Sequence, residues 1–92
     1  MRLKVCRWIK DCAGAAAAAK KTVVVNDVTK DPRYMAGSDL VKSEIVVPVL
    51  SKGALYGEID INSYFANTFS AEDQAFVEAC AALVGSYTEK AR

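Results

Sequence analysis

The stretch Ser-Glu-Ile-Val-Val-Pro at residues 43–48, followed by Gly-Glu-Ile-Asp-Ile-Asn-Ser at residues 57–63, decides the fold of this chain. Both segments are short and rich in β-branched residues, and Ser-Lys-Gly-Ala at residues 51–54 lies between them. Two such runs joined by a turn that contains glycine are typical of a β-hairpin. We therefore predict antiparallel strands over residues 43–50 and 54–63.

The polar positions of these strands carry carboxylates. Alternation along residues 54–63 places two sets of side chains on opposite faces: Leu55, Gly57, Ile59 and Ile61 on one, and Tyr56, Glu58, Asp60 and Asn62 on the other. Charged side chains are usually exposed, so Glu44 and Asp60 are either solvated positions or the wall of a pocket. The same two interpretations apply to Glu58.

The segments around the hairpin predict strands and helices within one domain that spans residues 1–92. We expect a weak strand over residues 1–10, a helix over 12–21, a strand over 22–26, a turn at 27–31 and a helical turn at 32–35. Ser70 opens the last helix, with Asp73 at the third position of a capping box. Because Pro48 cannot donate a backbone hydrogen bond, its strand has an open side or a bulge there.

The last helix carries two apolar stripes. One consists of Phe76, Cys80, Leu83 and Tyr87, and the other of Val77, Ala81 and Val84. Since one stripe is enough to face a core, we expect the second, at Val77, Ala81 and Val84, to contact another copy of the chain. The sequence therefore predicts a homodimer.

Composition excludes several classes of function. The chain has 92 residues, 52% of them hydrophobic, and a net charge of +1 without a clustered basic face, so nucleic acid is not an expected partner. It contains no histidine, which removes Ser-His-Asp and Cys-His catalysis and the usual zinc ligands. The longest run of apolar or small residues, 12–19, is far below the ~20 that span a bilayer. We expect a cytoplasmic protein without a membrane, metal or cofactor partner.

The hairpin segments resemble the central hairpin of GAF domains, above all those of the free methionine-(R)-sulfoxide reductases, whose pattern is similar to S-E-I-V-V-P and then G-V-L-D-I-D-S. The last acidic position of that pattern is Asn62 here. Residues 5–9 and 11–15 also resemble the A-C-x-R-I and G-V-C-G-x-A patterns of these reductases, with a shorter gap between the cysteines. The resemblance implies an α+β, profilin-like antiparallel sheet flanked by helices, in a domain that lacks the family's first helix and first strands.

The resemblance also implies the site residues. Glu44 and Asp60 match the carboxylates that receive the amino group of the amino acid, and Asn62 stands beside them. From this match we predict that Glu44 and Asp60 lie on one face of the sheet. Tyr34 and Met35 belong to the loop that would close over the pocket, or else pack against the sheet. Gly37 takes the place of the catalytic cysteine, so that only Cys12, which matches the resolving cysteine, could act in a reductase.

We therefore expect a catalytically inactive, sensory or regulatory module that binds a small, amino-acid-like molecule. The alternatives are a free methionine-(R)-sulfoxide reductase homologue, which needs a reactive cysteine beside the pocket, and a structural dimerisation module, which needs only a large apolar contact between copies.

Overall fold

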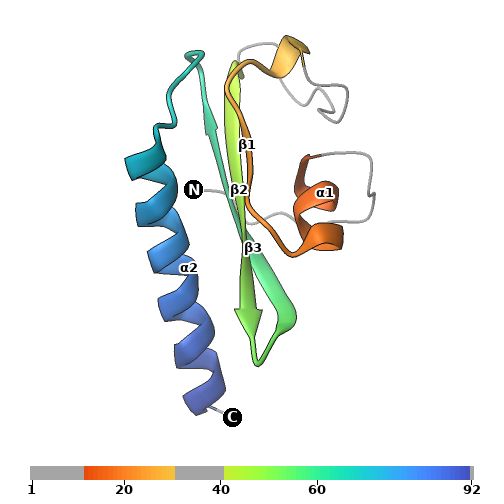
Figure 1. Ribbon diagram of the computed structural model, residues 1–92, viewed down its shortest axis with the longest axis vertical. Helices are drawn as coiled ribbons and strands as arrows, with labels where there is room; N and C mark the ends of the chain where they lie inside the picture. The colour runs from red at the N-terminus through yellow and green to blue at the C-terminus, as the bar shows by residue number, and fades with distance from the viewer. Residues whose placement is uncertain (1–11, 31–40, 92) are drawn as a thin grey trace.

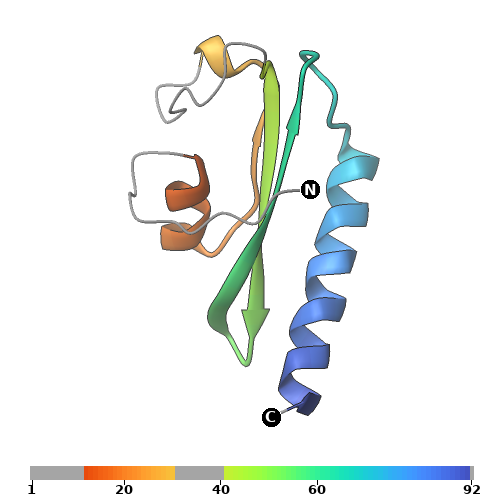
Figure 2. The ribbon, with the colours of Figure 1, turned by 180° about the vertical axis from the view of Figure 1, so that it is seen from behind.

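A three-stranded antiparallel sheet separates two helices in the computed structural model, which describes residues 12–30 and 41–91 (Figure 1). The elements are α1 (Cys12–Ala19), β1 (Val23–Val25), the 3-10 helix η1 (Val28–Lys30), β2 (Ser43–Ser51), β3 (Ala54–Ser63) and α2 (Ala71–Ala91). The strand order is β1-β2-β3. Both ribbon views place α1 on one side of the sheet and α2 on the other (Figure 2). The predicted α+β class is confirmed.

The hairpin forms as the sequence predicts. Lys52 and Gly53 both have positive φ values, 52° and 79°, which is the geometry of the two-residue turns that suit twisted hairpins. A bulge interrupts the pairing between Val49 and Leu50. On the other side of β2, β1 pairs only with residues 44–46, so it ends two residues before Pro48. The sheet therefore has both the open side and the nearby bulge that Pro48 predicts.

Alternation along β2 divides the core into two clusters. The cluster on the α1 side contains Cys12, Ala16, Val23, Val25, Val28 and Val46. The cluster on the α2 side contains Ile45, Val47, Val49, Val77 and Ala81. Because successive side chains of a strand point to opposite faces, the uninterrupted run of valine and isoleucine in β2 supplies both clusters, as expected for a strand covered on both faces.

The prediction for the two stripes of α2 is wrong. Val77 and Ala81 are buried against the sheet, with 7% and 3% of their surface exposed, and so cannot contact another copy. The outward stripe is instead the bulky one, since Phe76, Leu83 and Tyr87 are all at least 70% exposed. The helix turns its small side chains to the sheet because its backbone lies very close to β2 at Gly85.

In the N-terminal half, the observed helix and strand boundaries differ slightly from the predicted ones. The helix predicted over residues 12–21 ends at Ala19, the strand predicted over 22–26 is Val23–Val25, and the predicted turn at 27–31 contains η1. Lys20 has a φ of 55°, a left-handed conformation that ends a helix. The strand expected over residues 1–10 and the helical turn expected over 32–35 lie outside the described residues.

Replacing Ser70 with alanine should destabilise the protein by about 1 kcal/mol at neutral pH, because Ser70 caps α2. Its Oγ accepts a hydrogen bond from the Asp73 amide at 3.1 Å, and the Asp73 carboxylate accepts one from the Ser70 amide at 2.9 Å. This confirms the predicted capping box. The Ser70 amide and hydroxyl lower the pKa of Asp73, so this stabilisation is complete above the ordinary carboxyl pKa and is lost in stronger acid.

Thermal unfolding of Ser70→Ala at pH 7 and pH 3 measures this effect. The deficit relative to wild type should shrink at pH 3, whereas Ser86→Ala, at an exposed position of the same helix, should unfold like wild type at both pH values. An undiminished deficit at pH 3 would contradict a charge-assisted cap.

Candidate functional site

Three carboxylates lie on the face of the sheet that carries α1. In the register of the hairpin, Glu44 lies opposite Asn62, Val46 opposite Asp60, and Pro48 opposite Glu58. Residues that face each other across an antiparallel pair point to the same side, and Val46 belongs to the core cluster on the α1 side. Glu44, Asp60 and Glu58 are 2%, 0% and 5% exposed. We call these three residues the carboxylate face.

The burial of these side chains decides between the two interpretations of the sequence. Glu44 and Asp60 share a face as predicted, and they are diagonal neighbours across the strands, a relation in which Cα atoms lie ~7–8 Å apart. A solvated position is excluded for both, because neither is exposed. The carboxylate face thus brings buried acidic groups from two neighbouring strands to the same side of the sheet.

The other candidate site residues differ from Glu44 and Asp60 in their exposure or lie outside the described residues. Asn62 lies opposite Glu44 but is exposed, at the outer end of the same face. Glu58, whose role the sequence leaves undecided, is buried instead. Its position two residues before Asp60 places both side chains on one face of the strand, but alternation alone does not predict that Glu58 is buried. Tyr34, Met35 and Gly37 lie outside the described residues.

Of the two cysteines in the described ranges, Cys12 lies on the same side of the sheet as this site. Its side chain is 2% exposed and belongs to the α1-side cluster together with Val46, which lies directly opposite Asp60. Buried cysteines among apolar side chains are usually inert, because nucleophilic and redox chemistry needs access to the thiolate. Cys80 is partly exposed on α2, which packs on the opposite side of the sheet.

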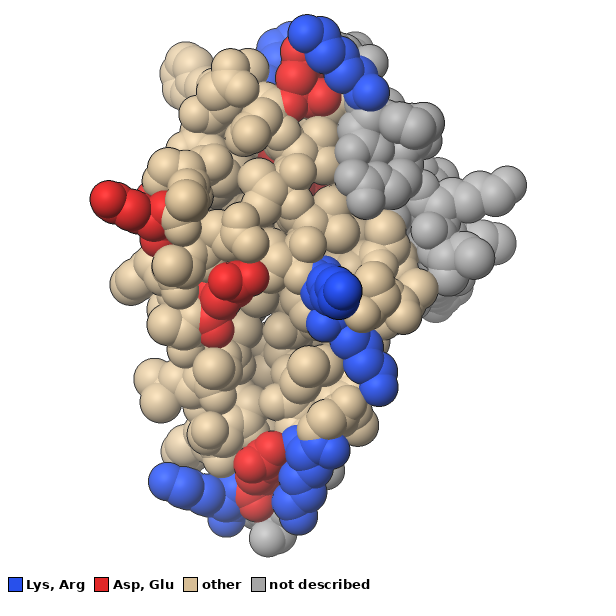
Figure 3. Space-filling view, viewed as in Figure 1, with Lys and Arg blue, Asp and Glu red and all other residues tan. Residues whose placement is uncertain are grey.

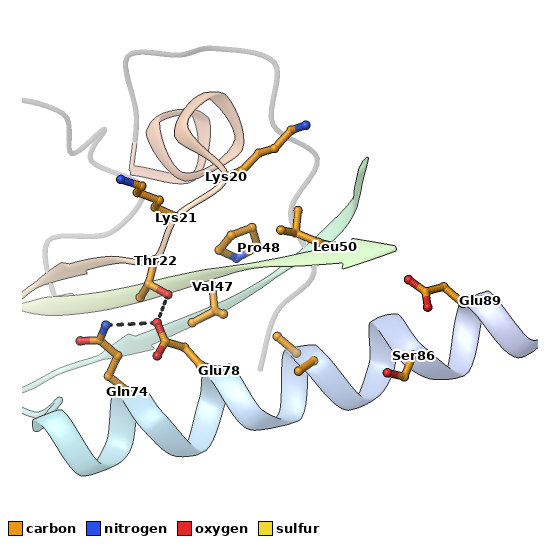
Figure 4. Close-up of a pocket in the computed structure, with 12 residues that line it drawn as sticks. Lys20, Lys21, Thr22, Val47, Pro48, Leu50, Gln74, Glu78, Ser86 and Glu89 are labelled. Carbon is orange, nitrogen blue, oxygen red and sulfur yellow. Dashed lines mark hydrogen bonds between the residues drawn. The ribbon is translucent and has the colours of Figure 1, made fainter. Parts of the chain in front are cut away.

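A groove of about 640 Å³ lies elsewhere, where β2 extends beyond β1 (Figure 4). Its walls come from β2, from α2 and from the segment between α1 and β1. Thr22 Oγ1 donates a 2.5 Å hydrogen bond to Glu78 Oε2, and Gln74 Nε2 donates one of 3.2 Å to the same oxygen. The bond from Thr22, followed by that from Gln74, lowers the pKa of Glu78, so the carboxylate ties α2 to the start of β1.

The groove and the carboxylate face are separate. None of the residues that line the groove is a ligand-binding residue predicted from the sequence. The polar groups of the groove are largely used by the fold, since Glu89 also accepts a hydrogen bond from the Lys52 amide. We therefore place the candidate site on the carboxylate face, where buried acidic groups lie on one side of the sheet, and not in the groove.

The charged side chains do not gather into a patch of one sign on the face of the molecule that Figure 3 shows. In the view of Figure 3 the acidic and basic side chains are scattered, and much of the surface between them is uncharged. Within the described ranges, no three histidine, cysteine or acidic side chains are arranged to hold a metal ion. Neither described helix is long and apolar enough to cross a bilayer.

Comparison with known proteins finds GAF-domain proteins, and several of them are free methionine-R-sulfoxide reductases. The chain is 41% identical over 76 residues to the free methionine-R-sulfoxide reductase of Saccharomyces cerevisiae, covering 82% of this chain and 42% of that protein. The type II free methionine-R-sulfoxide reductase of Thermoplasma acidophilum superposes with a TM-score of 0.79 at 37% identity, covering 83% of this chain and 54% of that one. The enzyme of Neisseria meningitidis, solved in complex with its substrate, superposes with a TM-score of 0.81 at 35% identity, covering 85% and 47%.

The chain thus spans about half the length of these relatives, so their complete activities do not transfer to it by similarity alone. Its fold nevertheless superposes on theirs over more than four fifths of this chain. A model of the GAF domain matches residues 4–87. The chain belongs to the GAF domain family.

Proposed function

We propose that this GAF domain binds a small, amino-acid-like molecule whose cationic amino group lies against Glu44 and Asp60, and that it does so without reducing its ligand. The observation that carries the proposal is the burial of both carboxylates on one face of the hairpin. The relatives named as free methionine-R-sulfoxide reductases support an amino acid of the methionine type as the ligand class.

Glu58 adds a third acidic group to the proposed site. Successive residues on one face of a strand lie ~7 Å apart, so Glu58 and Asp60 can both approach one ligand. In the pattern of the reductases the second acidic residue stands at the position of Asn62, which is exposed here. We propose that Glu58 takes over the missing charge and moves the amino group toward Pro48, its cross-strand partner.

Reduction of free methionine sulfoxide is the second candidate function. It is favoured by the position of Cys12, which packs in the same cluster as the residue opposite Asp60. It is disfavoured by the burial of this thiol and by glycine at position 37.

We propose that the domain senses its ligand in a regulatory role, as a cytoplasmic homodimer. The exposed apolar stripe of α2 supports the dimer, and a purely structural dimerisation module is the third candidate.

Replacing Asp60 with asparagine should weaken the binding of L-methionine by at least tenfold, because a hydrogen bond to a charged group contributes ~1.5–3 kcal/mol. Isothermal titration calorimetry measures the affinity, and circular dichroism verifies that the variant is folded. Glu72→Gln removes an exposed carboxylate on α2 and should bind like wild type. Asn62→Asp tests the same face at an exposed position and should tighten binding. Equal affinities of Asp60→Asn and wild type would contradict the proposal.

A further inference from the structure

The strand β2 continues beyond the end of β1. It pairs with β3 from Ser43 to Ser51, whereas β1 pairs only with residues 44–46. Within the described residues, no strand pairs with the other edge of β2 after Val46. An edge of this kind presents backbone N–H and C=O groups to which another extended segment can pair. The groove of about 640 Å³ lies along this open edge (Figure 4).

Two backbone groups of β2 are available on the open edge. Ser51 closes the two-residue hairpin turn, so its N–H and C=O point toward β3. Because these groups alternate along a strand, those of Leu50 and Pro48 point the other way. The Leu50 carbonyl lies against α2 at Gly85, and proline has no N–H, so the Pro48 C=O and the Leu50 N–H remain. In an added parallel strand, the residue opposite Val49 donates to the first and accepts from the second.

The two walls of the groove carry opposite charges. Lys20 and Lys21 follow α1 and form one wall, while Glu78 and Glu89 of α2 form the other (Figure 4). Among the described residues, no ion pair joins these walls. Lys20 Nζ donates one hydrogen bond, to the Gly53 carbonyl at 3.1 Å, and an ammonium group has three donors. The groove therefore suits a segment that is anionic toward one wall and cationic toward the other.

Small and apolar side chains line the groove between these charges. They are Val47, Pro48, Leu50, Ala81 and Ala82. The Pro48 and Leu50 side chains lie on the lysine side of β2 (Figure 4). An added strand alternates in the same way, so its residue opposite Val49 points to the α2 wall and that residue's two neighbours point to the lysines. With ~3.3 Å per residue, the length of β2 from Val47 to Leu50 accommodates three or four residues.

We propose that the groove binds an extended peptide of a partner protein, which adds to the open edge of β2 and carries one basic residue between two acidic ones. The basic side chain contacts Glu89, and the acidic side chains contact Lys20 and Lys21. In strand addition, main-chain hydrogen bonds supply affinity and the pockets for alternate side chains supply sequence preference. This site goes beyond the proposed amino-acid site, since none of the residues that line the groove belongs to the carboxylate face.

Fluorescence anisotropy of a fluorescein-labelled peptide, Thr-Glu-Arg-Glu-Val, tests the proposal with the 92-residue chain. We expect saturable binding. The charge-reversed peptide Thr-Lys-Glu-Lys-Val should bind at least tenfold more weakly, because each charge then meets a like charge. A peptide that is N-methylated at its arginine keeps every side chain but loses the N–H that pairs with the Pro48 carbonyl. It should also bind at least tenfold more weakly, because the methyl group takes the place of the hydrogen bond.

Variants of the protein test the place of binding. Ala82→Trp fills the groove from an exposed position of α2 and should abolish peptide binding, whereas Ala79→Trp, exposed on the same helix outside the groove, should bind like wild type. Lys21→Glu should weaken binding at least tenfold, and Lys42→Glu, at an exposed position away from the groove, should not. Circular dichroism verifies that each variant is folded.

Each result supports or overturns a part of the proposal. Absence of saturable binding by folded wild type, or binding that Ala82→Trp and Lys21→Glu leave unchanged, would overturn the groove as a peptide site. Equal binding of the N-methylated peptide would overturn strand addition, and equal binding of the charge-reversed peptide would overturn the role of the two walls. Wild type that binds the peptide but no amino acid would contradict only the proposed function of the carboxylate face.

Discussion

Replacing Gly85 with alanine should destabilise the protein by about 2 kcal/mol or more, although alanine is the better helix former. A Cβ atom at this position would overlap the backbone carbonyl oxygen of Leu50 in β2. This oxygen belongs to the main chain of a paired strand, so it cannot rotate away as a side chain could. The gain in helix propensity is about 1 kcal/mol, whereas forcing extra atoms into a packed contact typically costs 1–3 kcal/mol and moves the backbone.

Urea denaturation followed by circular dichroism measures this difference. Ser86→Ala is the matched control, because it changes the next residue of α2 at an exposed position and should stay within about 0.5 kcal/mol of wild type. Gly85→Val should be worse than Gly85→Ala, since valine adds bulk against the same carbonyl. A Gly85→Ala variant more stable than wild type would show that α2 does not approach β2 as described.

The second large effect concerns catalysis: no reduction of free methionine-R-sulfoxide should be detectable. The chemistry needs a thiolate that attacks the sulfoxide sulfur and becomes a sulfenic acid, which a second thiol resolves to a disulfide. Glycine stands at the position that matches the nucleophile, and the thiol of Cys12 is only 2% exposed. NADPH consumption coupled through thioredoxin and its reductase measures the turnover.

The free methionine-R-sulfoxide reductase of Saccharomyces cerevisiae provides the positive control for this assay. Turnover by the present chain that disappears in Cys12→Ser would contradict the proposal and would identify Cys12 as a relocated nucleophile. Turnover unchanged in Cys12→Ser would also contradict the proposal and would show that Cys12 is not the nucleophile, and a variant without any cysteine would then separate turnover by this chain from that of a contaminating enzyme.

The hairpin was predictable because it depends on local pattern. The common face of Glu44 and Asp60 was predicted from the resemblance to the GAF hairpin, because a bulge near Pro48 could shift the register and local alternation alone does not fix it. The capping box at Ser70 and Asp73 is equally local. The roles of the two stripes of α2 were not predictable. Both stripes are apolar. Which of them packs against the sheet depends on the close approach of α2 to β2 at Gly85, which is a tertiary contact with Leu50.

The burial of Glu58 also depends on tertiary packing that the sequence pattern does not reveal. A charged residue at an alternating polar position is usually solvated, and only the covering of that face by packed elements removes it from water. The alternation of the strand places Glu58 beside Asp60, but it does not say how far the covered region extends toward the hairpin turn. The structure shows Glu58 buried and Asn62, at the opposite end of the same face, exposed.

Calorimetric titration of wild-type protein with L-methionine and with N-acetyl-L-methionine tests the central claim most directly. The two ligands share the same side chain, but acetylation removes the positive charge that the carboxylate face is proposed to hold. We expect saturable binding of L-methionine and at least tenfold weaker binding of the acetylated compound, with the same order for the two corresponding sulfoxides. Equal affinity for the charged and the acetylated ligands, or no binding of any of the four, would contradict a site built on Glu44 and Asp60.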